Sequence, residues 1–359
     1  MNLEDLGYNE TLEQLWIEHN LQNFEIGRII TEHKERYVVN SAHGEYDAEI
    51  TGNLRFTATG REDFPAVGNW VALTIVDNYF AIIHAILPRF SMISRKAIDK
   101  QGHKQIIATN VDYAFIVQAV DRDFNINRLE RYLTICYTSK VTPLIILTKT
   151  DLMDNDTIAR IIQSIQSRIK NVQVFAISNI TKDGYSRLQQ SIEKGKTYCM
   201  LGSSGVGKST LINNLCGKDI MKTNTISQST QKGRHVTSHR QLIILENGGI
   251  FIDNPGMREV GIADASEGLE KTFDDIYHLA AYCKFKDCTH TSEVGCAVIH
   301  AVEHGQIDRK SYENYLKMTR EKAFFESTVA ERRKKDREFG KMMKNYKKEY
   351  GEIIKVIHY

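Results

Sequence analysis

The sequence has 359 residues, of which 42% are hydrophobic and 26% are charged, proportions close to those of globular proteins. This composition excludes collagen-like, low-complexity and wholly disordered chains, and the length predicts two or three domains, each with its own core. The mean hydropathy is −0.37, no apolar run approaches the roughly 20 residues of a membrane helix, and the N-terminus, MNLEDLGYNE, lacks the features of a signal peptide. We therefore expect a cytoplasmic protein that has no membrane partner.

Charge is distributed unevenly, although the net charge is only +2. Residues 1–50 carry eleven acidic and three basic side chains, whereas residues 331–348 carry nine basic and three acidic ones. A segment as basic as the second can attract phosphate groups. It is equally compatible with a solvated helix, so both interpretations stay open for residues 331–348.

The N-terminal residues predict a short amphipathic helix. Within residues 1–22, Leu12, Leu15 and Trp16 fall on one side of a helix, with Leu21 as a candidate fourth member.

Between about residues 24 and 88 the pattern changes to short runs typical of strands. Examples are YVVN, HGEYDAEITG, LRFTATG and NWVALTIV, and glycines punctuate them at Gly44, Gly52, Gly60 and Gly68. Regular short strands separated by turns predict a small antiparallel barrel or sandwich. The number of strands alone does not establish a barrel of the oligonucleotide-binding type.

After about residue 105, strands and helices alternate. Four apolar runs are typical of buried parallel strands: YAFIVQAV, PLIILT, VQVFAI and TYCML, at residues 113–120, 143–148, 172–177 and 197–201. Helical stretches such as INRLERYLTICYTS and DTIARIIQSIQSRI separate them. This alternation predicts a doubly wound α/β sheet. From about residue 268 the chain becomes helical, bears cysteine and histidine, and finally turns basic.

The strongest motif is GSSGVGKS at residues 202–209, which fits G-x-x-x-x-G-K-[ST] and lies between a predicted strand and a predicted helix. Glycines let the backbone N–H groups surround a phosphate, and the helix N-terminus adds partial positive charge. Lys208 is predicted to reach the β- and γ-phosphates and to take part in catalysis, and the Ser209 hydroxyl to bind Mg²⁺. The predicted nucleotide contacts of this loop are Gly202, Ser203, Ser204, Gly205, Val206, Gly207, Lys208, Ser209 and Thr210.

A second motif predicts which nucleotide is bound. The strand PLIILT ends in Thr148, Lys149, Thr150 and Asp151, a variant of the guanine motif N-K-x-D in which Thr148 replaces the usual Asn. The Asp151 carboxylate is predicted to accept from N1–H and the exocyclic amine of guanine. Adenine lacks this donor pair and would leave the carboxylate unpaired, at a high free-energy cost. Ser178 in AISNITKDG is a weaker candidate, which would place backbone donors against guanine O6.

A third element follows the run GGIFI. Asp253-Asn254-Pro255-Gly256 fits D-x-P-G, in which the Asp holds Mg²⁺ through water and the Gly256 N–H senses the γ-phosphate.

The segment KGRHVTSHR, which lies between the P-loop and D-x-P-G, is predicted to supply the switch threonine of the Mg²⁺ shell. We choose Thr237 for this role, with Ser238 as an alternative. Met257 stands where Ras-type enzymes have their catalytic Gln, and a thioether cannot orient water, so slow turnover is expected without external help. His235 is the candidate for a compensating catalytic group.

The order of these elements predicts a circular permutation. In an ordinary small GTPase the P-loop, switch threonine and D-x-P-G come first, and the guanine motif and Ser-bearing loop come last. Here the last two, at 148–151 and 178, precede the others. Such a rearrangement is tolerable because the termini of a domain usually lie near each other.

The C-terminal region contains Cys283, Cys288, His290 and Cys296, a set that can hold one tetrahedral Zn²⁺. Four protein ligands leave no open position, so the metal is expected to be structural. Three nearby histidines suit helix faces better than the metal: His278, His300 and His304.

Taken together, the motifs GSSGVGKST, KGRHVTSHR, DNPGMRE and CKFKDCTHTSEVGC resemble those of the ribosome small subunit-dependent GTPase A family, over nearly the whole chain. The resemblance implies an N-terminal OB-fold, GTP hydrolysis stimulated by the small subunit, and a zinc domain that docks on rRNA. Val236 and Asn254 replace threonines that are usual in the family, but neither position carries an essential ligand.

The expected architecture is therefore a multidomain chain with a helical extension at 1–22, an OB-like β-barrel at 23–95, a circularly permuted P-loop α/β GTPase domain at 96–265, and a mainly helical zinc-binding domain with a basic tail at 266–359. We expect a monomeric GTPase that uses GTP or GDP with Mg²⁺ and one structural Zn²⁺ and assists late assembly of the 30S subunit. In this interpretation GTP favours binding to the subunit and its rRNA, and hydrolysis drives release. Two alternatives stay open: a P-loop ATPase that acts on nucleic acid, and a nucleotide-regulated RNA-binding module without significant turnover.

Overall fold

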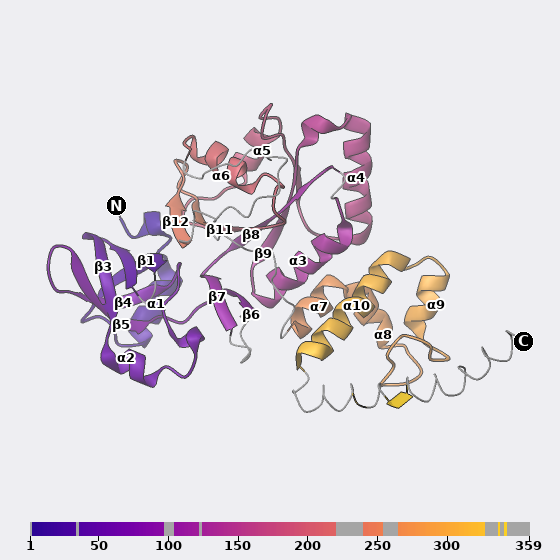
Figure 1. The fold of residues 1–359 in the computed structure, drawn as a ribbon, viewed down its shortest axis with the longest axis horizontal. Coiled ribbons are helices and arrows are strands. Elements are labelled where there is room, and N and C mark those ends of the chain that lie inside the picture. The colour runs from indigo at the N-terminus through magenta and orange to yellow at the C-terminus, as the bar shows by residue number, and fades with distance from the viewer. Residues whose placement is uncertain are drawn as a thin grey trace, which may run out of the picture.

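The computed structural model describes residues 2–33, 36–96, 104–121, 124–219, 240–253 and 265–326, together with residues 337, 341 and 342. In Figure 1 an N-terminal barrel, a central sheet flanked by helices and a helical C-terminal unit follow one another across the molecule. Among these residues, no helix combines the length and apolar character needed to cross a membrane. The predicted switch segment at 232–239 and nearly all of the basic segment at 331–348 lie outside the described residues.

The N-terminal residues form the short helices η1 (Glu4–Leu6) and α1 (Glu10–Glu18). Asn9 caps α1, because its side chain accepts a hydrogen bond from the Leu12 backbone N–H at 3.1 Å. Leu12 and Trp16 are buried in one cluster with Trp70 of the barrel. The predicted amphipathic helix is confirmed, although it is shorter than residues 1–22.

Five strands close into a barrel: β1 (Glu25–His33), β2 (Arg36–Ser41), β3 (Gly44–Ile50), β4 (Trp70–Ile75) and β5 (Phe80–Ile86). Their order is β1-β2-β3-β5-β4, and β4 pairs with β1 to close the ring. In β3, Tyr46, Ala48 and Ile50 are buried and the residues between them are exposed, as expected of a strand with one face toward a core. The predicted barrel is confirmed and is of the five-stranded OB type. Its purely antiparallel pairing is wrong, because β3 and β5 run parallel.

The prediction of a strand over LRFTATG is also wrong. Gly52–Thr57 form the helix α2, and the Thr51 hydroxyl caps it by accepting from the Leu54 N–H at 3.2 Å. No residue of α2 is buried, so no core-facing alternation favours an extended strand here. The helix η2 (Arg61–Asp63) follows before β4 begins.

The central sheet follows a hairpin of β6 (Met92–Lys96) and β7 (Lys104–Thr109). Its strands are β8 (Tyr113–Ala119), β9 (Thr142–Thr148), β10 (Val174–Ala176), β11 (Thr197–Leu201), β12 (Arg240–Ile244) and β13 (Ile250–Asp253). They lie in the order β10-β9-β8-β11-β13-β12, and only β12 runs antiparallel to its neighbour β13. The strand that leads into the P-loop, β11, follows β8, β9 and β10 in the chain but lies between β8 and β13 in the sheet. The predicted permutation is therefore confirmed.

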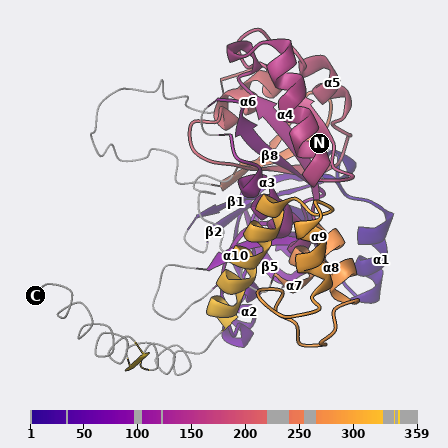
Figure 2. The same ribbon diagram turned by 90° about the vertical axis from the view of Figure 1, so that its right-hand side faces the viewer.

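Helices cover both faces of this sheet: α3 (Ile126–Thr138), α4 (Asn155–Arg168), α5 (Tyr185–Gln190) and α6 (Lys208–Cys216) (Figure 2). In β8, Ala114 and Ile116 pack in one hydrophobic cluster with residues of α3 and α4. Their neighbours Phe115 and Val117 pack in a second cluster with residues of α5 and α6. Successive side chains of a strand point to opposite faces, so the strand is buried on both sides, as its apolar run predicts.

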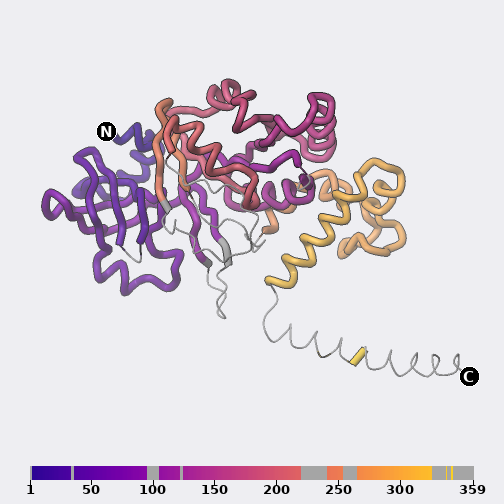
Figure 3. The backbone as a smooth tube through the Cα atoms, turned by 45° about the horizontal axis from the view of Figure 1, so that its top comes forward, coloured from indigo at the N-terminus to yellow at the C-terminus, as the bar shows by residue number. Residues whose placement is uncertain are grey.

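The barrel lies directly beside the central sheet (Figure 3), and the two are joined into one sheet. Strand β1 pairs antiparallel with β12, with Thr31 opposite Gln241 and Glu32 opposite Arg240. All barrel strands and all strands of the central sheet consequently belong to one eleven-stranded sheet.

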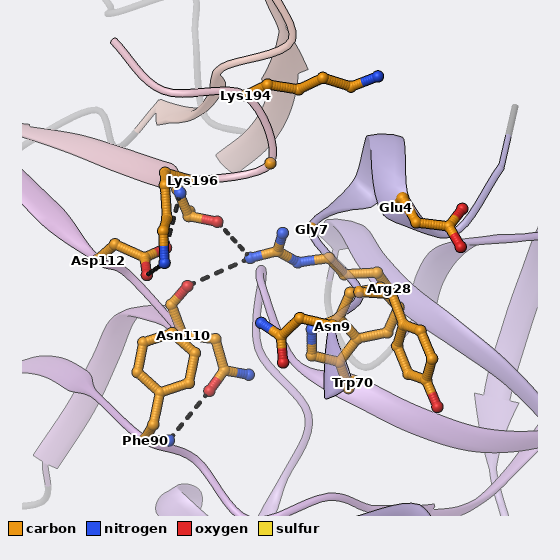
Figure 4. A pocket seen from close by; sticks show the side chains of 13 residues that line it. Glu4, Gly7, Asn9, Arg28, Trp70, Phe90, Asn110, Asp112, Lys194 and Lys196 are labelled. Atoms are coloured by element: carbon orange, nitrogen blue, oxygen red, sulfur yellow. Dashed lines mark hydrogen bonds and ion pairs between the residues drawn. The ribbon is translucent and has the colours of Figure 1, made fainter. Parts of the chain in front are cut away.

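Arg28 holds this junction from inside (Figure 4). Its side chain is 1% exposed and lines a cavity of about 330 Å³. The guanidinium donates to the backbone oxygens of Leu6, Gly68 and Asn110 and, at 2.8 Å, to the Thr197 hydroxyl. Burial lowers the pKa of Arg28 to about 10, so the group stays charged at neutral pH. One buried cation therefore joins the N-terminal helix, the barrel and the central sheet.

The C-terminal unit consists of α7 (Ser266–Thr272), α8 (Asp274–Ala280), α9 (Ala297–Glu303) and α10 (Arg309–Glu326). It packs on α3, where a Cβ on Gly268 of α7 would lie 2.3 Å from the Thr134 backbone oxygen, so only glycine allows this approach. Glu130 of α3 is buried and accepts hydrogen bonds from Arg168 and from Asn314 of α10. Because a buried carboxylate needs such partners, this contact holds the helical unit on the sheet.

Candidate nucleotide site and metal centre

The P-loop connects β11 to α6 and needs glycine at three positions. Gly202, Gly205 and Gly207 have φ angles of 152°, 78° and 91°, which side chains with a Cβ rarely adopt. A Cβ on Gly202 would also lie 2.3 Å from the backbone oxygen of Val117 in β8. The motif thus folds as its sequence predicts, with Gly207 in the left-handed conformation directly before α6.

The charged end of Lys208 lies over the loop. Its ammonium donates to the backbone oxygens of Gly202, at 2.7 Å, and of Ser203. Ser209 and Thr210 occupy the first turn of α6, where a hydroxyl and free backbone N–H groups can meet an anion and its metal. From the neighbouring helix α3, Arg128 donates to the Ser203 hydroxyl at 3.1 Å.

The guanine motif lies at the carboxyl end of β9, beside the P-loop. Thr148 is fully buried, and its hydroxyl donates to the Val206 backbone oxygen at 2.6 Å. Lys149 has a left-handed backbone, and its ammonium lies 2.8 Å from the Asp121 carboxylate. Thr150 is buried, whereas Asp151, the predicted guanine ligand, is exposed.

The Ser-bearing loop after β10 is the third element of the site, beside the P-loop and the guanine motif. The Ser178 hydroxyl donates to the Asp151 carboxylate at 2.5 Å and accepts from the backbone N–H groups of Ile180 and Thr181. Asn179 donates from its side chain to the Gly207 backbone oxygen at 3.1 Å. The structure thus brings together three loops that are distant in the sequence: Thr148 and Val206, which are in contact, lie 58 residues apart.

Several residues of this site were missed by sequence reasoning. Asp121 follows a buried strand at its carboxyl end, a position where polar side chains often serve a site, and that signal was available. The others lack a motif because their roles depend on tertiary contacts: Arg128, Asn179, Tyr185 and Asn214.

The predicted Mg²⁺ ligands are only partly described. Asp253 ends β13, which lies next to β11 and runs parallel to it, so Asp253 and Ser209 follow neighbouring strands at the same edge of the sheet. A hydroxyl and a carboxylate are oxygen donors of the kind that Mg²⁺ prefers. Thr237, His235 and Gly256 lie outside the described residues.

Cys283, Cys288, His290 and Cys296 form a compact cluster, with all four ligand atoms within 4.8 Å of one another. Nδ1 of His290 lies 3.5 Å from Sγ of Cys283 and 3.4 Å from Sγ of Cys296, and these two sulfurs are 3.8 Å apart. Tetrahedral Zn²⁺ with ordinary bond lengths separates its ligand atoms by about 3.5–3.8 Å. The four side chains therefore fit zinc in their chemistry, and Cys283, His290 and Cys296 also fit it in their spacing.

The surroundings of the cluster fix its shape. His290 has a left-handed backbone (φ 58°), and its carbonyl accepts from the Tyr312 hydroxyl of α10 at 2.6 Å. Cys296 caps α9 by accepting from the Ile299 N–H. The other nearby histidines make contacts outside the cluster: His300 stacks on His304, and the His278 ring lies 3.1 Å from the Asp274 carboxylate.

Comparison with known proteins agrees with this geometry. A family model described as RsgA GTPase matches residues 86–263. A second model, described as a 50S ribosome-binding GTPase, matches residues 197–332. The second match begins at the first residue of β11, the strand that opens a GTPase domain in its unpermuted order.

Relatives match over nearly the full length. The small ribosomal subunit biogenesis GTPase RsgA 2 of Lactiplantibacillus plantarum is 44% identical over 329 residues, which cover 90% of this chain and 92% of that protein. The corresponding RsgA 1 of Bacteroides thetaiotaomicron is 39% identical over 351 residues, 97% of each chain.

Two solved structures share the fold. The crystal structure of YloQ, described as a circularly permuted GTPase, has a TM-score of 0.62 and 24% identity, over 87% of this chain and 99% of that one. YjeQ from Thermotoga maritima has a TM-score of 0.61 and 24% identity, over 82% of this chain and 96% of that one.

Fold and site together define a circularly permuted P-loop GTPase with an OB-like barrel. The chain belongs to the RsgA GTPase family, and it is a GTP hydrolase that binds guanine nucleotide.

Proposed function

We propose that this protein uses GTP hydrolysis to assist late maturation of the small ribosomal subunit, and that it acts as a monomer in the cytoplasm. The observation that carries the proposal is the meeting of the P-loop, the guanine motif and the Ser-bearing loop at one edge of the sheet. The small subunit as partner is supported by the relatives, which are named small ribosomal subunit biogenesis GTPases.

The nucleotide is proposed to lie across these three loops. Asp151 accepts from the guanine N1–H and amine, and Lys149, held by Asp121, lies along the base. The backbone N–H of Asn179, which makes no hydrogen bond to another described residue, is free to donate to O6. The P-loop N–H groups and Lys208 surround the phosphates.

Mg²⁺ is proposed to be held by Ser209 and, through water, by Asp253, with Thr237 completing the shell. When bound, the ion offsets negative charge on the phosphates. Lys208 contributes a second positive charge and, with the P-loop N–H groups, orients the γ-phosphate. His235 is proposed to orient the attacking water in place of the absent Gln, and Gly256 to contact the γ-phosphate.

The zinc centre is proposed to be structural, since its four side chains fill a tetrahedral shell. It would fix the loop between α8 and α9 and thereby shape a surface that docks on rRNA. The domain boundaries proposed are 1–22, 23–95, 96–265 and 266–359.

The test is GTP turnover measured with and without purified small ribosomal subunits, with large subunits as the control and ATP as the competing substrate. We expect slow turnover alone and a large stimulation that only the small subunit gives. Equal turnover of ATP, or stimulation by both subunits, would contradict the proposal. A Lys208→Ala variant provides the background rate of the preparation.

A further inference from the structure

Asn179 contacts α6, the helix whose N-terminus follows the P-loop, at two separate places. Its side-chain amide donates to the Gly207 carbonyl at 3.1 Å, directly before the helix begins. Its backbone carbonyl accepts from the side chain of Asn214, near the end of the same helix, at 3.1 Å. The loop after β10 is therefore attached along almost the full length of α6.

A buried tyrosine holds Asn179 in this orientation. The Tyr185 hydroxyl donates to Oδ1 of Asn179 at 2.6 Å and accepts from Asn214 at 2.8 Å, so the amide is fixed with its NH₂ group toward Gly207. Tyr185 is 6% exposed. A Cβ on Gly207 would lie 2.5 Å from Nδ2 of Asn179, so the contact also depends on glycine at that position.

The residue before Asn179 belongs to the base-binding side of the site. Ser178 is fully buried and donates to Asp151, the predicted guanine ligand. Two successive residues thus connect the guanine motif on one side to the start of the phosphate-binding helix on the other.

We propose that Asn179 is a positioning residue that fixes the Ser-bearing loop after β10 relative to the N-terminus of α6. A guanine nucleotide contacts both elements at once, and such a ligand gains affinity when its two subsites are held at the right separation. The inference rests on the proposed nucleotide site and adds that the amide side chain of Asn179 contributes to the coupling between base recognition and phosphate binding.

This role makes a prediction that a purely local role does not. In Asn179→Ala the backbone that faces the base and the P-loop that faces the phosphates both remain, and so does the bond from Asn214 to the backbone carbonyl of residue 179. The hydrogen bond to the Gly207 carbonyl, which holds the loop at the start of α6, is lost. We expect GDP affinity to fall about tenfold, and the affinities for guanosine and for Mg²⁺-pyrophosphate, each of which fills one subsite, to change less than about twofold.

The experiment measures the binding of GDP, guanosine and Mg²⁺-pyrophosphate by competition against a fluorescent guanine nucleotide, in the full-length protein. Tyr185→Phe removes only the hydroxyl that orients Asn179 and should lower GDP affinity in the same selective way, by about threefold. Gln190→Ala, an exposed change on the same helix as Tyr185, is the matched control and should leave all three affinities unchanged.

The inference is overturned if guanosine binding weakens as much as GDP binding, since Asn179 would then act only on the base, or if GDP affinity is unchanged in both variants. If Asn179→Ala does not fold, the Tyr185→Phe comparison decides by the same criteria. A wild-type protein that fails to bind GDP would instead contradict the proposed function, so the two failures are distinguishable.

Discussion

The Thr148 hydroxyl donates a 2.6 Å hydrogen bond to the backbone carbonyl of Val206, so the guanine motif and the P-loop are joined by one short contact. In a trans peptide the carbonyl and the following N–H point in opposite directions. A carbonyl held toward Thr148 therefore directs the Gly207 N–H away from it. Threonine can replace the usual asparagine here because a hydroxyl is enough to make this contact.

Thr148→Val keeps the shape of the side chain but leaves the buried Val206 carbonyl without its partner, which costs about 1–3 kcal/mol. We expect a lower free energy of unfolding in urea and weaker binding of both GDP and GTP. Thr148→Asn, which restores a donor, should recover at least part of the stability and of the nucleotide affinity. Wild-type affinity and stability in Thr148→Val would show that the contact contributes nothing.

Asp151→Asn should shift nucleotide preference from guanine toward xanthine, because an amide can donate to the xanthine carbonyl at the position of the guanine amine. The variant can still accept the Ser178 hydroxyl bond through its Oδ1, so the loop should remain folded. Binding of GTP and xanthosine triphosphate is compared in the two proteins. Unchanged GTP affinity in the variant would disprove the assignment of Asp151.

Ser209→Ala should largely abolish Mg²⁺-dependent hydrolysis and leave the fold intact, because it removes one proposed metal ligand from the half-buried start of α6. Turnover across a Mg²⁺ titration, with circular dichroism as the folding control, measures both. Full activity at low Mg²⁺ would remove Ser209 from the metal shell.

The purified protein should contain about one zinc per chain, and Cys288→Ala should lose it. Structural zinc contributes on the order of 10 kcal/mol to the folding free energy of small domains. Without the metal, the region around α8 and α9 should therefore unfold locally. GDP binding should persist, because the central sheet has its own core. Metal analysis of protein prepared without chelator checks this, and a zinc-free, folded C-terminal unit would refute it.

The basic segment at 331–348 yields a prediction from charge alone. If the segment follows an RNA backbone, replacing Arg332, Arg333, Lys334 and Lys335 by Ala should weaken binding to the small subunit. The slope of log affinity against log salt concentration should become less steep by roughly 0.7–0.9 for each lost phosphate contact. Turnover without ribosomes should stay the same. Unaltered affinity and salt dependence would indicate a solvated helix.

Sequence patterns predicted the parallel strands β8, β9, β10 and β11 well because each of them carries its own signal. An apolar run such as PLIILT or TYCML is buried on both faces, so its composition alone indicates a parallel strand. The P-loop was equally clear, because its glycines adopt conformations that few other residues can.

The barrel was harder to predict, because its pairing depends on which strands meet and not on any one of them. The parallel β3–β5 pair and the capped helix α2 were both missed, since LRFTATG has strand-like residues but no buried face. Arg28 and Asn179 lay beyond sequence reasoning for a related reason. Their partners, such as Thr197 and Gly207, are far away in the chain, and no local pattern marks them.

The pairing of β1 with β12 also has a consequence for solubility. An edge strand presents unpaired N–H and C=O groups that can recruit another chain and start aggregation. In the central sheet this exposed side would be β12, but β1 covers part of it, and β1 itself belongs to a closed ring that has no edge of its own. Because β1 covers β12, the barrel protects this side of the central sheet against self-association. At the other side the short strand β10 is the outermost strand.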